Sequence, residues 1–495
     1  MSTVSFAFLF FFTVVLLVYY LFPVRHRWMV LLAGSIFYFW KVSGSKLLLV
    51  FLGICLMNFL VGIGMGRFMQ QEKQWKVRVI YVLAVVADVA ALVLYKDSDF
   101  FHAHLAAPVG ISYFTLILIG YLTDIYWGKF HAENNFFRFT LFTSYFPQLS
   151  SGPFVKYDIT GKDLAKPHLF DFEKIVSGME RVLWGFFKKL VIAERLSVLV
   201  NTVYGDCQTY SGFYVFVAVG AFTLQLYADF SGAMDIALGV SECFGVELPE
   251  NFRTPFYSVS IQEFWRRWHI TLGEWLREYA FYPLQRSRIF SRLRKWCRKK
   301  WGKNFEKRLN LPMYLGLFIT WFLIGFWHGG KWNYIWGSGL YYWLLITLAD
   351  LMAPVFQKAV RILGINTACW SWKFFQRVRT VLLFTFGLSF FRAESIRAGI
   401  ALWKSAFSVN NIWILFDSSL YSLGLDRQDF SVLIYALIIL FAAEHYKNRF
   451  DLREKLGEQN YLFRLAVVLS MVLGVVIFGK YGANYVASAF IYEQF

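Results

Sequence analysis

The fold class of this chain is decided by an apolar run that ends at a histidine, PMYLGLFITWFLIGFWH, residues 312–328. The residues from Pro312 to Trp327 are enough to cross most of a bilayer, because a helix rises about 1.5 Å per residue. An imidazole at that depth is unfavourable in free energy and is usually retained for a task, so His328 is a candidate site residue. A structural alternative stays open, in which a neighbouring helix satisfies the imidazole by hydrogen bonding.

The composition extends this interpretation to the whole chain. Of 495 residues, 58% are hydrophobic and 21% are aromatic, and the mean hydropathy is +0.47. No soluble domain needs that much apolar surface, so we predict an all-α polytopic membrane protein. The net charge is +18, but the Lys and Arg residues fall between apolar segments. That pattern favours membrane orientation and contact with anionic lipids over nucleic-acid binding.

Hydrophobic periodicity predicts roughly 11–13 helices in one membrane domain, 1–495. Arg25 and Arg27 follow the first apolar stretch, so we expect an external N-terminus, and parity then places the C-terminus outside as well. Segments 136–153 and 398–416 are apolar but interrupted, which favours re-entrant or interfacial helices. The predicted spans lie at about 5–22, 28–40, 46–66, 77–95, 108–127, 178–200, 211–231, 313–330, 332–350, 380–391, 430–446 and 464–479.

The segment 250–311 is the least ordinary part of the chain. Aromatic residues from Phe264 to Tyr279 recur at helical spacing with charged residues between them, which predicts an amphipathic helix at the cytoplasmic face. His269 falls on the border of its apolar face. Cations then dominate from Arg286 to Arg308. Contact with anionic lipid headgroups is one explanation of that basic run. Binding of an anionic donor, such as coenzyme A or an acidic carrier protein, is the other.

Two motifs are specific, and five weaker ones accompany them. The specific motifs are QEFWRRWH (262–269), with FYPL (281–284) behind it, and GFWHG (325–329). The weaker ones are PVGISYF (108–114), YFPQL (145–149), FFKK (186–189), YADFSG (227–232) and FFRA (390–393). Together and in this order, they resemble the membrane-bound O-acyltransferase family, in particular its bacterial branch of alginate O-acetyltransferase-like proteins and the related teichoic acid D-alanyl transferases. The resemblance covers most of the chain.

The resemblance implies a catalytic role for His328 and a supporting role for His269, with a central tunnel joining the cytoplasmic face to the bilayer interior. A neutral imidazole suits acyl transfer to a hydroxyl because it is a base near neutral pH. The implied donor is an acyl thioester, acetyl-CoA or a carrier protein, with no tightly bound cofactor. The five cysteines are scattered, so we expect no metal site. The donor-binding candidates are Trp265, Arg266, Arg267 and Trp268.

The chain ends in F-x-Y-x-x-F, from Phe490 to Phe495, within an expected external tail 480–495. This ending resembles the acyl-carrying motif of bacterial cell-surface acylation systems, which makes Tyr492 a candidate acceptor. A partner of the SGNH-hydrolase type would then pass the acyl group to an extracytoplasmic polysaccharide. The alternative is an aromatic anchor at the membrane boundary, where Tyr and Phe collect.

Three functions remain open from the sequence. The first is O-acetylation of a cell-surface or secreted polysaccharide at a bacterial plasma membrane. The second is D-alanyl transfer from a carrier protein to teichoic acid. The run QRSR (285–288) departs from the pattern of the alginate-like group and leaves the acceptor polymer open. The third is a transporter, although the chain has no clear internal repeat.

Overall fold

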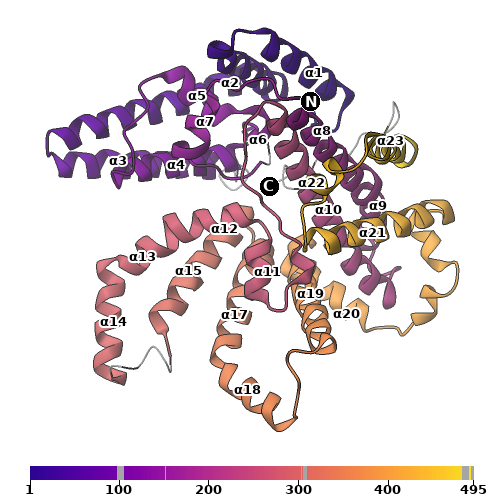
Figure 1. Ribbon diagram of the computed structural model, residues 1–495. Coiled ribbons are helices and arrows are strands. Elements are labelled where there is room, and N and C mark those ends of the chain that lie inside the picture. The colour runs from indigo at the N-terminus through magenta and orange to yellow at the C-terminus, as the bar shows by residue number, and fades with distance from the viewer. Residues whose placement is uncertain (97–104, 151, 303, 305–308, 482–489, 492–495) are drawn as a thin grey trace. The chain divides into compact units, whose positions relative to one another are not determined.

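The computed structural model describes residues 1–96, 105–150, 152–302, 304, 309–481 and 490–491. These residues form helices and no strand (Figure 1), which confirms the all-α prediction. Among them, six helices are long and apolar enough to cross a membrane, or seven if one bent pair forms a single span, so the protein is polytopic. The six are Val24–Gln70, which contains α2, Gln74–Lys96 (α3), Phe213–Cys243 (α10), Leu311–His328 (α15), Arg427–Lys447 (α21) and Tyr461–Phe478 (α23); the bent pair is Trp332–Leu351 with Ala353–Ile362.

The helices gather into two compact units, and the chain passes between them several times. The helix α10 begins in unit 2 and ends in unit 1. The single membrane domain expected from the sequence stays a prediction. Unit 1 comprises Met1–Val191, Ala228–Glu250 and Asp451–Phe495, and unit 2 comprises Ile192–Tyr227 and Asn251–Phe450.

In unit 1, the predicted spans 28–40 and 46–66 correspond to two helical stretches on either side of a kink. The element α2 (Arg27–Gln70) contains both stretches, and the kink lies at Gly44, whose φ of +81° and ψ of +172° are not helical. Glycine adopts that angle without a Cβ clash, so the bend needs no loop. The helix packs against its neighbours α1 (Phe6–Leu21), α3, α4 (Ile111–Tyr126) and α5 (Phe136–Ser144).

The interrupted segment 136–153 forms two short helices inside unit 1. The first is α5, and the second is α6 (Phe146–Leu149), with a break at Tyr145. Every residue from Phe139 to Leu149 is buried. Non-helical backbone at membrane depth is tolerated only where protein covers it, and these helices meet that condition.

The predicted span 178–200 is not one α-helix. It divides into α8 (Phe172–Phe186), a π-helical turn η3 (Phe187–Ala193) and α9 (Glu194–Gly205). The turn carries two consecutive buried lysines, Lys188 and Lys189. The wider π turn is common at functional sites.

Unit 2 is built around a cluster of aromatic side chains. Trp265 packs on Trp321 and Tyr342 with ring centroids 5.1 and 4.9 Å apart, and Phe264 packs on Phe384 at 4.0 Å. The chain reaches this cluster through α11 (Ile261–Arg267), α12 (Ile270–Leu276), α13 (Tyr282–Arg286), α14 (Arg288–Trp301), α15, α16 (Trp332–Ile335), the π-helical turn η7 (Trp336–Leu340), α17 (Tyr341–Leu351), α18 (Ala353–Ile362), α19 (Trp370–Arg392) and α20 (Ile396–Ala406). Figure 1 shows α14 returning beside α15.

Candidate functional site

The expected amphipathic helix across Phe264–Tyr279 is interrupted at His269, so the prediction of one continuous helix is wrong. The helix α11 ends at Arg267, α12 begins at Ile270, and His269 between them has φ +49° and ψ +50°. This left-handed conformation is strained for any residue with a Cβ. Thr254, a β-branched residue, is left-handed too, at φ +43°. Such strain is typical of functional sites.

The physical reason for the break is a short cross-link between α11–α12 and the segment before them. Phe252 and Trp268 form an isolated antiparallel bridge. The Arg253 N–H donates to the Arg267 carbonyl at 2.9 Å, and the Ile270 N–H donates to the Asn251 carbonyl at 3.0 Å. The backbone groups released by ending α11 are therefore satisfied outside the helix. Sequence periodicity cannot predict such a bridge, because it describes the residue spacing within one segment and the bridge joins two segments.

Asn251 holds the His269 imidazole. Its Oδ1 accepts from the Thr271 N–H at 3.1 Å and the Thr271 hydroxyl at 2.9 Å. Its Nδ2 then lies 3.2 Å from His269 Nδ1. His269 Nδ1 also lies 3.3 Å from Asn251 Oδ1. Because Oδ1 already accepts two hydrogen bonds from Thr271, we infer that the amide donates to Nδ1 and that Nε2 carries the proton of the neutral ring. Asn251 was not among the predicted site residues, since an asparagine in an extended segment carries no sequence signal.

Burial also fixes the charge of His269. The side chain is only 3% exposed, and the loss of solvation lowers its pKa from 6.5 to about 3. Desolvation disfavours the imidazolium because a charge in an apolar surrounding loses its hydration. The ring is therefore neutral at physiological pH.

His328 ends α15 and is likewise 3% exposed. Its ring lies 4.9 Å from that of Trp327 and 5.4 Å, edge to face, from that of Phe391. Trp327 also contacts His269, with centroids 6.1 Å apart. The structure thus brings the two predicted histidines to one indole, from elements far apart in the sequence.

Two glycines let the backbones around His328 approach closely. A Cβ at Gly325 of α15 would lie 2.5 Å from the Ile335 Cα, and a Cβ at Gly337 would lie 2.5 Å from the Phe391 nitrogen. Real Cβ atoms do not tolerate such distances. Gly325 therefore allows α15 to pack closely on α16, and Gly337 allows η7 to pack closely on α19, which carries Phe391 beside the histidine.

The four donor-binding candidates occupy three kinds of environment. Trp268 is buried in the aromatic core, against Phe252 and Phe384. Trp265 is partly buried in the same cluster. Arg267 pairs with Glu263 at 2.7 Å and donates to the Thr254 hydroxyl at 3.1 Å. Arg266 is exposed. Their role in donor binding stays a prediction, for which Arg266 has the accessible charge.

The basic run forms a separate amphipathic helix, α14. It buries Phe290 and Cys297 and exposes most of its cations. Among the described residues, no carboxylate pairs with the exposed cations of α14. Their field is therefore available to an anionic surface. The exposed cations are Arg288, Arg292, Lys295, Arg298, Lys299 and Lys300.

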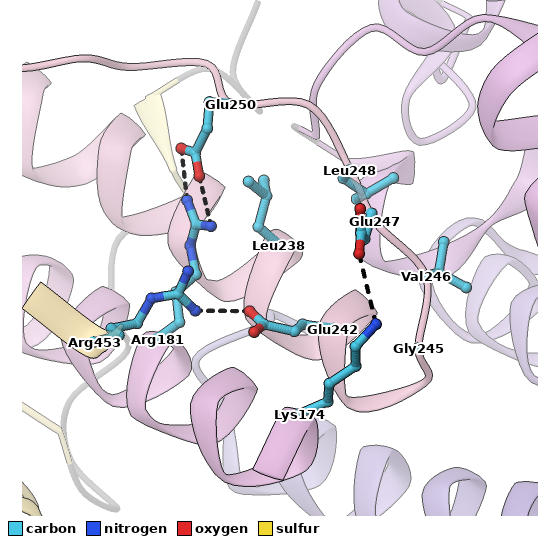
Figure 2. Close-up of a pocket in the computed structure, with 10 residues that line it drawn as sticks. All are labelled: Lys174, Arg181, Leu238, Glu242, Gly245, Val246, Glu247, Leu248, Glu250 and Arg453. Atoms are coloured by element: carbon cyan, nitrogen blue, oxygen red, sulfur yellow. Dashed lines mark hydrogen bonds and ion pairs between the residues drawn. The ribbon is translucent and has the colours of Figure 1, made fainter. Parts of the chain in front are cut away.

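A cavity of about 290 Å³ in unit 1 contains neither histidine (Figure 2). Its charged walls pair with one another: Arg181 binds Glu250 at 2.7 Å, Arg453 binds Glu242 at 2.7 Å, and Lys174 binds Glu247 at 3.6 Å. Because the wall charges cancel, this cavity has no net field to attract an anionic donor.

Two further predictions concern other parts of the molecule. Tyr492 lies outside the described residues, so its role stays a prediction. Within the described ranges, no group of three or more His, Cys, Asp or Glu side chains could hold a metal ion.

Comparison with known proteins gives consistent relatives. Residues 131–298 match the MBOAT, membrane-bound O-acyltransferase family. The chain is 31% identical over 467 residues to the probable alginate O-acetylase AlgI of Pseudomonas aeruginosa, covering 89% of this chain and 81% of the relative. It is 27% identical over 461 residues to the peptidoglycan O-acetyltransferase of Helicobacter pylori, covering 85% and 80%. The teichoic acid D-alanyltransferase of Bacillus subtilis is 29% identical over 288 residues, covering 54% and 67%.

Proposed function

Because this chain belongs to the membrane-bound O-acyltransferase family and is a membrane-bound acyltransferase, we propose that it moves an acetyl group from a cytoplasmic thioester to an extracytoplasmic polysaccharide. The observation that carries the proposal is the pair of buried histidines on one indole, His328 and His269 on Trp327. Family membership favours an enzyme over a transporter.

In this proposal His328 is the general base. The acceptor hydroxyl oxygen forms a bond to the thioester carbonyl carbon, and the carbon–sulfur bond breaks. The imidazole of His328 takes the hydroxyl proton and returns it to the departing thiolate, so no net proton is consumed. The aromatic rings of Trp327 and Phe391 support this role, because they pack on the imidazole and hold its orientation.

His269 acts as the positioning partner. Its neutral ring, held by Asn251, presents Nε2–H as a donor. A donor aimed at the thioester carbonyl oxygen would stabilise the negative charge that develops there. The strained backbone at His269 supports this assignment, since it fixes the ring direction before substrate arrives.

The donor side lies at the cytoplasmic face, where acyl thioesters are made. Arg266 and the exposed cations of α14 attract the phosphates of coenzyme A, and anionic lipid headgroups as well. In this scheme the protein resides in the bacterial plasma membrane with both termini external. The acyl group passes through a central tunnel while coenzyme A stays inside.

On the external side, Tyr492 accepts the acyl group and a partner of the SGNH-hydrolase type passes it to the polysaccharide. A phenol with a pKa of about 10 leaves more readily than an alkyl alcohol, which suits an intermediate carrier. The relatives named for O-acetylation of alginate and peptidoglycan align with 85–89% of this chain, which supports acetyl as the group.

A second candidate is D-alanyl transfer from an acidic carrier protein to teichoic acid. The similarity to the D-alanyltransferase over 54% of this chain favours it. The exposed cations of α14 favour it too, because they would attract an acidic carrier protein. The two differ in the donor that the enzyme accepts.

The deciding experiment supplies purified protein with labelled acetyl-CoA or labelled D-alanyl carrier and follows label on the protein by mass spectrometry. We expect acetyl on the C-terminal peptide of the wild type and none on Tyr492→Phe, which removes one hydroxyl. Label from the D-alanyl carrier alone would establish the second candidate. Undiminished polymer acetylation by Tyr492→Phe in cells would remove Tyr492 from the route.

A further inference from the structure

In unit 1, a buried ion pair joins the turn η3 to the candidate membrane-spanning helix α10. Lys189 Nζ is 2.7 Å from Asp229 Oδ1, and the two side chains are 0% and 2% exposed. Lys189 belongs to the π-helical turn η3, and Asp229 lies in the middle of the membrane-spanning helix α10. Charges at such positions are unfavourable unless they are paired, and they are usually functional.

The same carboxylate holds the end of the chain. The Ile491 N–H donates to Asp229 Oδ2 at 2.8 Å, so one oxygen serves the lysine and the other the C-terminal backbone. Phe490, only 1% exposed, lies with its ring centroid 4.7 Å from Lys189 Nζ. Both members of the ion pair therefore contact the segment Phe490–Ile491.

A second pair of the same composition lies on the same two elements. Lys188 Nζ lies 2.5 Å from Asp235 Oδ2 and donates to the Ser231 hydroxyl at 2.8 Å, and Arg181 Nε donates to Asp235 Oδ1 at 3.0 Å. These contacts join side chains of α8, η3 and α10. The Lys189–Asp229 pair receives in addition a main-chain donor from Ile491 and an aromatic ring from Phe490.

The chemistry of the contact is selective. A carboxylate oxygen accepts a backbone N–H in a charge-assisted bond, and a desolvated ammonium attracts the face of an aromatic ring. The first residue of the F-x-Y-x-x-F motif is the one that supplies the ring. Its burial also separates it from the aromatic residues that anchor helices at the membrane boundary, because those keep one edge in the interface.

We propose that Lys189 and Asp229 form an anchor site for the chain's own C-terminal segment, which recognises the phenylalanine ring at 490 and the N–H of residue 491. Because Tyr492 is bonded directly to Ile491, the anchor restricts where that hydroxyl can reach. This consequence, and only this one, rests on the proposed function. Lys189 and Asp229 are then positioning residues.

The test measures how fast carboxypeptidase Y removes the C-terminal residues of the purified protein, without any acyl donor, by intact-protein mass spectrometry. Wild-type trimming should pause at Ile491. Phe490→Ser alters only the tail and should release Ile491 about tenfold faster, as expected for loss of contacts to charged groups. Phe463→Ser is the matched control, since Phe463 is 58% exposed on α23 in the same unit.

A second variant removes the anchor from the core side. Lys189→Met combined with Asp229→Leu replaces a buried ion pair with apolar side chains of similar size, which leaves folding nearly unchanged. Ile491 should again be lost about tenfold faster. Equal trimming rates in the wild type and both variants would overturn the anchor. Faster loss of Ile491 from Phe490→Ser together with normal polymer acylation would support the anchor site and contradict the role of Tyr492 as acyl acceptor.

Discussion

Two buried polar sites, one in each unit, are built in different ways. In unit 1, Arg181, Lys188 and Lys189 form ion pairs of 2.5–3.0 Å with Asp229, Asp235 and Glu250, so charge is matched by charge. In unit 2, His269 and His328 are packed among aromatic rings, and burial keeps His269 uncharged. Breaking a buried ion pair is strongly destabilising, whereas a buried imidazole is usually retained for a task.

The substitution with the largest expected effect is His328→Ala, which tests the role of the buried histidines in unit 2. Loss of a general base lowers turnover by about 10²–10⁴-fold, while the protein should insert and unfold as the wild type does. Turnover of labelled thioester by purified protein checks the first part, and thermal unfolding in detergent checks the second. His445→Ala, at an exposed histidine of unit 2, is the control. Near-wild-type turnover of His328→Ala would end the catalytic assignment.

Asp235→Ala should act on the other unit and in the opposite sense. It removes the carboxylate that pairs with both Arg181 and Lys188, and breaking a buried ion pair in this way destabilises by about 3–5 kcal/mol. Denaturant unfolding of unit 1 reports the loss. Activity per folded molecule should change less than in His328→Ala. A stable Asp235→Ala protein would show that the network contributes little to the fold.

The neutral state of His269 makes a pH prediction. The native pKa is about 3, below the 6.5 of the unfolded chain. As pH falls from 7, the imidazole binds a proton in the unfolded chain but not in the native protein. The stability of the native protein is therefore lost below about pH 6.5. His269→Gln lacks this pH dependence, because it removes the imidazole. Between pH 7 and 4.5 the wild type should lose about 2.5 kcal/mol more stability than the variant, measured by chemical unfolding. Parallel pH curves would contradict a neutral native imidazole.

The smallest expected effect concerns the exposed cations of α14. Replacing Arg292, Lys295, Arg298, Lys299 and Lys300 by Gln should raise the KM for the thioester several-fold at low salt and little at high salt. Salt screens exposed charges beyond about 8–10 Å. The same change at Lys358, Arg361 and Lys373, also exposed in unit 2, is the control. An unchanged KM with poor membrane insertion would assign α14 to lipid contact.

Much of this architecture follows from the sequence because its signals are local. Apolar runs predict helices such as α3, α15 and α23, and the motifs around His269 and His328 single out the residues that meet at Trp327. What escaped prediction depends on contacts between distant segments. The Phe252–Trp268 bridge breaks a helix that periodicity predicts to be continuous, and Asn251 contacts His269, which lies 18 positions further along the sequence.

The charged residues of unit 1 illustrate the same limit. Lys188, Lys189 and Asp229 lie inside the motifs FFKK and YADFSG, yet no role could be predicted for them from the motifs alone. Their partners lie on other helices or at the end of the chain, 262 positions from Asp229 in the case of Ile491. Pairing of that kind depends on the fold rather than on spacing.

The left-handed backbone at His269 has a consequence for mutational drift. Glycine would relieve about 1 kcal/mol of backbone strain there, so selection for stability alone favours replacing the histidine. A library randomised at this position and sorted only for expression should therefore drift toward glycine. Sorted for acylated polymer, it should return histidine. The difference in histidine frequency between the two sorted libraries measures how far this residue is retained for activity rather than for folding.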